Sequence, residues 1–98
     1  MDMKKLIAEI VGDWDFTFQG QSLAVQFTEN DGKLFGAPPG ETPEEIKPVA
    51  DKPLCFDVTV AASGEYYLIQ FARDDKGVLN KCVMTVSGMT AEGVKVIK

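Results

Sequence analysis

The sequence has no histidine and only two cysteines among its 98 residues. Without histidine, the chain cannot build a Ser-His-Asp triad, a Cys-His pair or a histidine metal site from its own residues. Cys55 and Cys82 fit no metal-ligand spacing, because two thiolates alone do not complete a zinc site. We therefore expect two reduced, partly buried thiols, with no catalytic residues, metal site or cofactor.

Basic residues are also scarce. The chain has ten basic and 15 acidic residues, which gives a formal charge of −5. Arg73 is the one arginine, and no lysine cluster is longer than Lys4-Lys5. Nucleic-acid binding depends on Lys and Arg displacing counterions from phosphates, and anionic membranes attract the same side chains. The charge balance therefore argues against nucleic acid and membrane surfaces as partners.

Long apolar runs are missing as well. No segment approaches the roughly 20 apolar residues that span a bilayer. The apolar stretch from Leu6 to Val11 is interrupted by Glu9, and it is too short and too charged for a signal-peptide core. We expect a cytoplasmic protein if the chain is complete, and a periplasmic or secreted one if it is a domain of a longer chain.

The remaining polar motifs fit turns and wet surfaces better than catalysis. Serines occupy expected turns, and the nine glycines are dispersed without forming a phosphate-binding run. The loops 30–32 and 74–77 lack the further ligands of a calcium site. Paired carboxylates occur at Asp13/Asp15, Glu44/Glu45 and Asp74/Asp75. Their strand and turn positions indicate solvated charge rather than an acid–base pair.

The length of the chain favours a single domain that spans residues 1–98. Residues 1–11 form a short amphipathic helix, because Met3, Leu6, Ile7 and Ile10 recur at helical spacing. Asp2 is the expected N-cap and Gly12 the expected stop.

From residue 13 to residue 98, apolar and polar residues alternate with the period of two that is typical of strands. Trp14, Phe16 and Phe18 give the clearest example. Turn residues separate the strands, and 38–42 is expected to be an exposed loop because it is rich in proline. The expected strands are 13–19, 23–28, 33–37, 45–49, 54–61, 66–73, 78–86 and 93–98.

Eight short strands joined by tight turns favour an antiparallel up-and-down barrel or half-barrel, closed at one end by the helix. A bulge near Asn80-Lys81 is needed to turn both Leu79 and Cys82 inward. Cys55 and Cys82 fall on the fifth and seventh strands, about 10 Å apart at the usual strand spacing, so we predict that they form no disulfide.

The interior and the outer face of this barrel give two candidate sites. The interior either encloses an apolar ligand or is filled, because small barrels have just enough room for side chains. Its expected lining is Trp14, Phe16, Phe18, Phe27, Phe56, Tyr67 and Phe71. On the outer face, Tyr66, Leu68 and Val83 are either covered by the helix or exposed as a partner surface.

Three segments carry a family resemblance: 11–16 (VGDWDF), 31–35 (DGKLF) and 69–78 (IQFARDDKGV). Together they resemble the small domain of unknown function that follows many bacterial β-lactamase-like serine hydrolases. Trp14 stands where that family usually has tyrosine. Gly12-x-Trp14 is similar to the motif with which the sequences of lipocalin-like barrels begin. The resemblance implies a lipocalin-like barrel with an accessory role, and it implies no catalytic residues.

Two functions remain open at this stage. The first is a non-catalytic accessory or interaction domain that uses its outer face or the loop 38–42 to bind a protein partner or a second copy. The second is a lipocalin-like barrel that binds a small hydrophobic ligand. A continuous interior cavity favours the binder, whereas a filled interior with an apolar outer patch favours the interaction domain.

Overall fold

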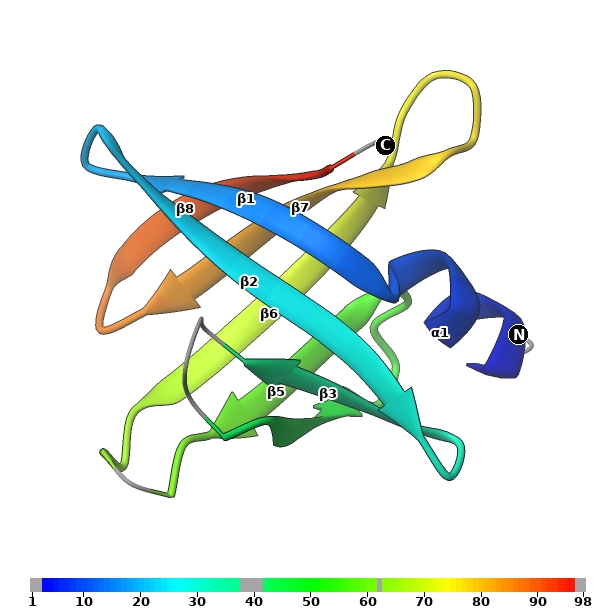
Figure 1. Ribbon diagram of the computed structural model, residues 1–98, viewed down its shortest axis with the longest axis horizontal. Helices are drawn as coiled ribbons and strands as arrows, with labels where there is room; N and C mark the ends of the chain where they lie inside the picture. Colours follow the sequence, from blue (N-terminus) through cyan, green and yellow to red (C-terminus); the bar gives the residue numbers. More distant parts are fainter. Residues whose placement is uncertain (1–2, 38–41, 62, 97–98) are drawn as a thin grey trace.

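The computed structural model describes residues 3–37, 42–61 and 63–96. It is a closed barrel of eight antiparallel strands in sequence order, with one short N-terminal helix at one end (Figure 1). This confirms the mainly β, up-and-down barrel predicted from the sequence. The elements are α1 (Met3–Ile10), β1 (Gly12–Phe18), β2 (Gln21–Asn30), β3 (Lys33–Ala37), β4 (Glu44–Pro48), β5 (Cys55–Thr59), β6 (Tyr66–Arg73), β7 (Leu79–Val86) and β8 (Met89–Lys95).

Two-residue turns with positive φ connect several strands. Asp31-Gly32 has φ values of 56° and 78°, as a type I′ turn requires, and it joins β2 to β3 as predicted. Ser87-Gly88, with φ values of 51° and 77°, makes a similar turn between β7 and β8. The last strand therefore begins at Met89, four residues earlier than predicted, because Ser87-Gly88 alone completes the turn and residues 89–92 already pair with β7. Asp2 and residues 38–41 lie outside the described residues.

A bulge in β7 sets the phase of that strand. Ala72 pairs with Lys81 and Arg73 pairs with Leu79, so Asn80 is the extra residue. Leu79 and Cys82 are consequently both buried inside the barrel. The predicted bulge is confirmed.

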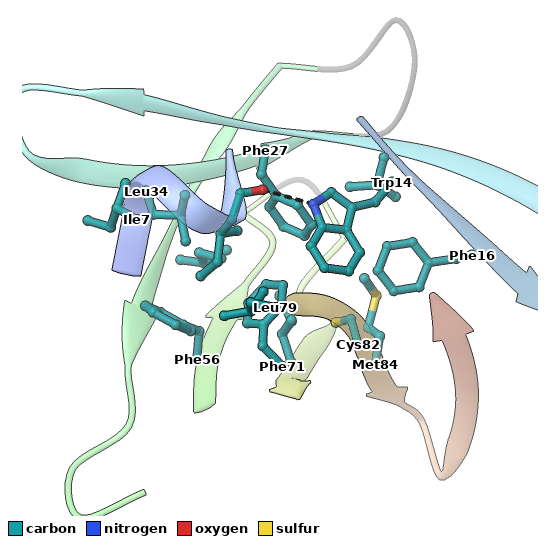
Figure 2. Close-up of a cluster of buried hydrophobic side chains, with 14 of the residues drawn as sticks. Ile7, Trp14, Phe16, Phe27, Leu34, Phe56, Phe71, Leu79, Cys82 and Met84 are labelled. Carbon is teal, nitrogen blue, oxygen red and sulfur yellow. Dashed lines mark hydrogen bonds between the residues drawn. The ribbon is translucent and has the colours of Figure 1, made fainter. Parts of the chain in front are cut away.

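Aromatic rings fill the part of the barrel next to α1 (Figure 2). Trp14, Phe27 and Phe71 meet edge to face, with ring centroids 5.4–6.0 Å apart. Phe56 meets Phe71 in the same way at 5.7 Å. Such pairs stabilise a core somewhat beyond the area that they bury. All four rings are essentially inaccessible to solvent, so they form a packed centre.

Two strand glycines make room for these rings. Phe16 pairs with Gly93 across β1 and β8, and a Cβ at Gly93 would lie 2.5 Å from the Phe16 ring. Phe27 pairs with Gly36 across β2 and β3, where an added Cβ would lie 3.0 Å from the ring. In both pairs, the absent side chain lets the ring lie over the neighbouring strand.

Helix α1 is attached to the barrel by apolar packing and by polar contacts. Leu6, Ile7 and Ile10 are buried against the core. The indole Nε1 of Trp14 donates a 2.8 Å hydrogen bond to the carbonyl oxygen of Ile10. This bond satisfies one of the carbonyls left free at a helix C-terminus, and it fixes the helix to β1.

A charged cluster adds a second attachment. The guanidinium of Arg73, at the end of β6, contacts both carboxylate oxygens of Glu9 at 2.6 and 2.9 Å. The ammonium of Lys95 donates to the carbonyl oxygen of Glu9. The hydrogen bond with Arg73 holds the pKa of Glu9 below its ordinary value. The helix is thus linked to β6 and β8, two strands that come late in the sequence.

The two cysteines are free and buried, as predicted. Cys55 pairs with Gln70, whereas Cys82 pairs with Phe71, the next residue on β6. Neighbouring strand residues point to opposite faces, so the two thiols lie on opposite sides of the sheet. Burial raises the pKa of both thiols, which keeps them protonated and poorly nucleophilic.

Candidate functional site

The barrel interior contains all seven aromatic residues proposed as a ligand lining. Five of them are fully buried in the core, and Phe18 and Tyr67 pack against it while remaining partly exposed. The buried five are Trp14, Phe16, Phe27, Phe56 and Phe71. Because four of these rings, all but Phe16, contact one another, they occupy the centre of the barrel instead of lining an open space there.

The end of the barrel opposite α1 is packed less completely. Leu23 shares the inward face of β2 with Val25, yet it is 45% exposed. Met89 shares the inward face of β8 with Ala91, and it is 42% exposed. Both residues lie near the turns that Figure 1 shows at the far side from the helix. We call this region the far end, and its inward-facing apolar side chains are only partly covered.

The outer face carries the predicted partner residues. Tyr66 is 51% exposed, Val83 is 39% exposed and Leu68 is half-buried. The helix does not cover them, because its buried side chains pack against the core at the barrel end. The alternative in which these residues form an exposed apolar surface is therefore the observed one.

A fourth residue, Val94, extends this surface. Val94 is 56% exposed, and its partner Lys81 lies two residues before Val83 on β7. The four residues form a diagonal row across β6, β7 and β8, which we call the outer row: Tyr66, Leu68, Val83 and Val94. Sequence reasoning missed Val94 because Gly93 occupies the inward position beside it, and a glycine carries no apolar signal.

A hydrogen bond orients the tyrosine of the outer row. The Tyr66 hydroxyl donates to the Asp57 carboxylate on β5 at 2.8 Å. That bond is the main reason why the pKa of Tyr66 lies above its ordinary value. The ring is therefore held along the sheet, where it presents a fixed apolar face to solvent.

Grooves run along both sides of α1. One, of about 360 Å³, lies between the first turn of the helix and residues 48–56. The other, of about 390 Å³, lies between the helix and the turn that joins β2 to β3. The first groove reaches Cys55, whose raised pKa makes it a poor nucleophile. Neither groove contains a group prepared for covalent chemistry.

Among residues 3–37, 42–61 and 63–96, no cluster of cysteine, aspartate or glutamate is arranged to hold a metal ion. The helix in this part of the chain is not long and apolar enough to cross a membrane.

Asp74 hydrogen bonds to the backbone N–H groups of Lys76 and Val78, which keeps its pKa low and gives it a role in the turn. Asp74 thus stabilises a turn, and Glu9 stabilises the attachment of the helix.

Comparisons with protein-family models, with curated proteins and with solved structures find no match for this chain. The site must therefore be interpreted from its own geometry.

Proposed function

We propose that this chain is a non-catalytic interaction domain that binds a protein partner through the outer row. The observation that carries the proposal is the exposure of Tyr66, Val83 and Val94 on strands whose inward faces pack against a filled core. Exposed apolar side chains that lie side by side are typical of partner surfaces, and a tyrosine with an oriented ring is a common anchor residue in interfaces.

The accessory role implied by the family resemblance agrees with this proposal. An accessory domain needs a stable scaffold and a recognition surface, and it needs no acid, base or nucleophile of its own. The aromatic centre supplies rigidity, and the outer row supplies the contact surface.

The test compares two Val→Asp variants at exposed positions. Val83→Asp places a charge in the outer row, whereas Val78→Asp places one in the turn between β6 and β7, where Val78 is 51% exposed against 39% for Val83. A partner captured by the wild-type chain and then purified should bind Val83→Asp at least about tenfold more weakly, because an anion is desolvated in the interface. Val78→Asp should bind it like the wild type. Equal binding by all three chains contradicts the proposal.

The far end supports a second candidate function, binding of a small apolar ligand. Leu23 and Met89 point into the barrel but are partly exposed. Phe18 on β1 and Tyr67 on β6 also point into the barrel. A thermal-shift screen with apolar compounds decides between the two functions. Saturable stabilisation that is lost in a Leu23→Ser/Met89→Ser variant and kept in Val83→Asp favours the ligand-binding function.

A further inference from the structure

Three of the four residues of the outer row have a carboxylate as a direct neighbour. Strand register places an acidic residue directly opposite each of these three on the neighbouring strand. The pairs are Leu68 with Asp57, Val83 with Glu92, and Val94 with Asp15. Directly opposite side chains lie about 5 Å apart at Cβ, so each acid borders the apolar surface beside it.

Most of the charged residues around the outer row are acidic. Among the described residues directly opposite the row, Lys81 is the one that carries a positive charge, and it is paired with Val94. The other neighbours are neutral, as Gln70 and Thr85 are. The row is therefore an apolar line bordered by a carboxylate on each side, Asp57 on β5 and Asp15 on β1, and Lys47 of β4 lies directly opposite Asp57.

The barrel limits how a partner can bind. All eight strands pair with two neighbours, so the described sheet has no free edge to which a partner strand could be added. The partner must use side chains laid across the face. Diagonal neighbours in a sheet are about 7 Å apart, so the row of four spans roughly 20 Å. An α-helix of about 14 residues has that length.

A second copy of this chain is a poor occupant. A symmetric dimer through the outer row would bring the same surface of each copy together. Asp15, Asp57 and Glu92 of one copy would then face the same carboxylates of the other, and like charges in an interface oppose association.

We infer that the outer row binds a basic amphipathic helix of another protein, with aliphatic side chains on one face and lysine or arginine on both flanks. This inference rests on the proposed function and specifies the chemistry of its partner. The aliphatic side chains pack on Leu68, Val83 and Val94, and the flanking cations pair with the three carboxylates. The charges set selectivity and the rate of encounter, while the apolar row supplies buried area.

The experiment uses two synthetic 14-residue helical peptides with the same leucine positions. One carries lysine and arginine on its flanks, and the other carries glutamate. Binding to the isotope-labelled chain is followed by NMR titration, which reports both affinity and location. The basic peptide should shift the resonances of β6, β7 and β8, and the acidic peptide should produce no saturable shift.

Two charge variants distinguish the effect of the carboxylates beside the row from the effect of the net charge of the chain. Asp15→Asn/Asp57→Asn/Glu92→Gln removes the carboxylates beside the row, and it should weaken binding of the basic peptide about tenfold. Asp31→Asn/Asp51→Asn/Asp75→Asn makes the same change in net charge within exposed turns, and it should change binding less than about twofold. Asparagine is as suitable as aspartate at the positive φ of Asp31 and Asp51, so the control should fold normally.

Each other outcome contradicts the inference. If the turn variant loses as much affinity as the row variant, net charge alone explains binding. If both peptides bind equally and Val83→Asp weakens both, the outer row is a partner surface but its partner need not be basic. If neither peptide binds, the basic-helix partner is wrong, and the purified-partner comparison of Val83→Asp with Val78→Asp still decides the proposed function.

Discussion

The two ends of the barrel follow the same alternation of inward and outward residues, yet only one is fully packed. At the helix end, Trp14, Phe27 and Phe71 lie beneath α1 and are sealed from solvent. At the far end, Leu23 and Met89 occupy inward positions and remain nearly half exposed. Pointing inward is thus not sufficient for burial, because a side chain also needs atoms above it.

This difference predicts where the free energy of folding is concentrated. Rings at the helix end are surrounded on all sides, so their removal leaves a cavity. Side chains at the far end already contact water, so their removal changes little. We expect the helix end to determine stability and the far end to tolerate substitution.

The largest expected effect comes from truncating the central ring. Phe71→Ala should lower the free energy of unfolding by about 3–5 kcal/mol, because Phe71 contacts Trp14, Phe27 and Phe56 and the site cannot collapse around the lost ring. Leu23→Ala, the matched truncation at the far end, should cost less than about 1 kcal/mol. Urea unfolding measures both values, and similar losses would remove the distinction between the ends.

Glycine substitution tests how tightly two of the buried rings are packed. Gly93→Ala should cost about 1–3 kcal/mol, because the added Cβ would lie 2.5 Å from the buried Phe16 ring, which has little room to move. Gly36→Ala should cost less, because its Cβ would lie 3.0 Å from Phe27 and a small shift relieves the contact. Thermal unfolding of the two variants should show this order. The opposite order would mean that Phe16 adjusts more easily than its burial indicates.

The smallest effect concerns the charged contact that holds α1. The pKa of Glu9 is lowered in the folded chain, chiefly by its hydrogen bond with Arg73 and also by the charges of Lys5 and Lys95. A lowered pKa stabilises the fold above the pKa of the unfolded chain, and this contribution is lost as the pH falls through the folded value. Glu9→Gln should therefore cost about 0.2–1 kcal/mol at pH 7 and less near pH 3.

Paired urea titrations at the two pH values measure this effect. Glu29→Gln is a suitable control, because Glu29 is an exposed carboxylate that hydrogen bonds to the N–H of Gly32 and has no contact with Arg73. It should not reproduce the pH dependence of the Glu9 variant. If the cost of Glu9→Gln is the same at both pH values, the contact with Arg73 does not contribute through charge.

Much of the fold was predictable because its signals are local. Alternation gave the limits of β3 and β6, and the conflict in phase between Leu79 and Cys82 located the bulge at Asn80. The separation of the cysteines followed from strand order alone. The start of β8 was missed because the turn at Ser87-Gly88 was not recognised as a hairpin.

The candidate site was predictable only in part. The outward positions of Tyr66, Leu68 and Val83 follow from the alternation of inward and outward residues on two adjacent strands. Their full or partial exposure agrees with the alternative in which the helix does not cover them. Asp15 could not be identified as a neighbour of Val94 in this way, because the two residues are almost 80 positions apart and become neighbours only when β8 pairs with β1. Their register depends on barrel closure, which no local pattern encodes.

By itself, the sequence determined the class of the fold, the inward aromatic residues and the absence of histidine chemistry, because these depend on residue type and on a period of two. The tertiary structure alone decided which inward side chains are buried, which carboxylates border the outer row, and how Trp14 and Arg73 hold the helix. Those features are contacts between distant segments, and their geometry exists only after the barrel has closed.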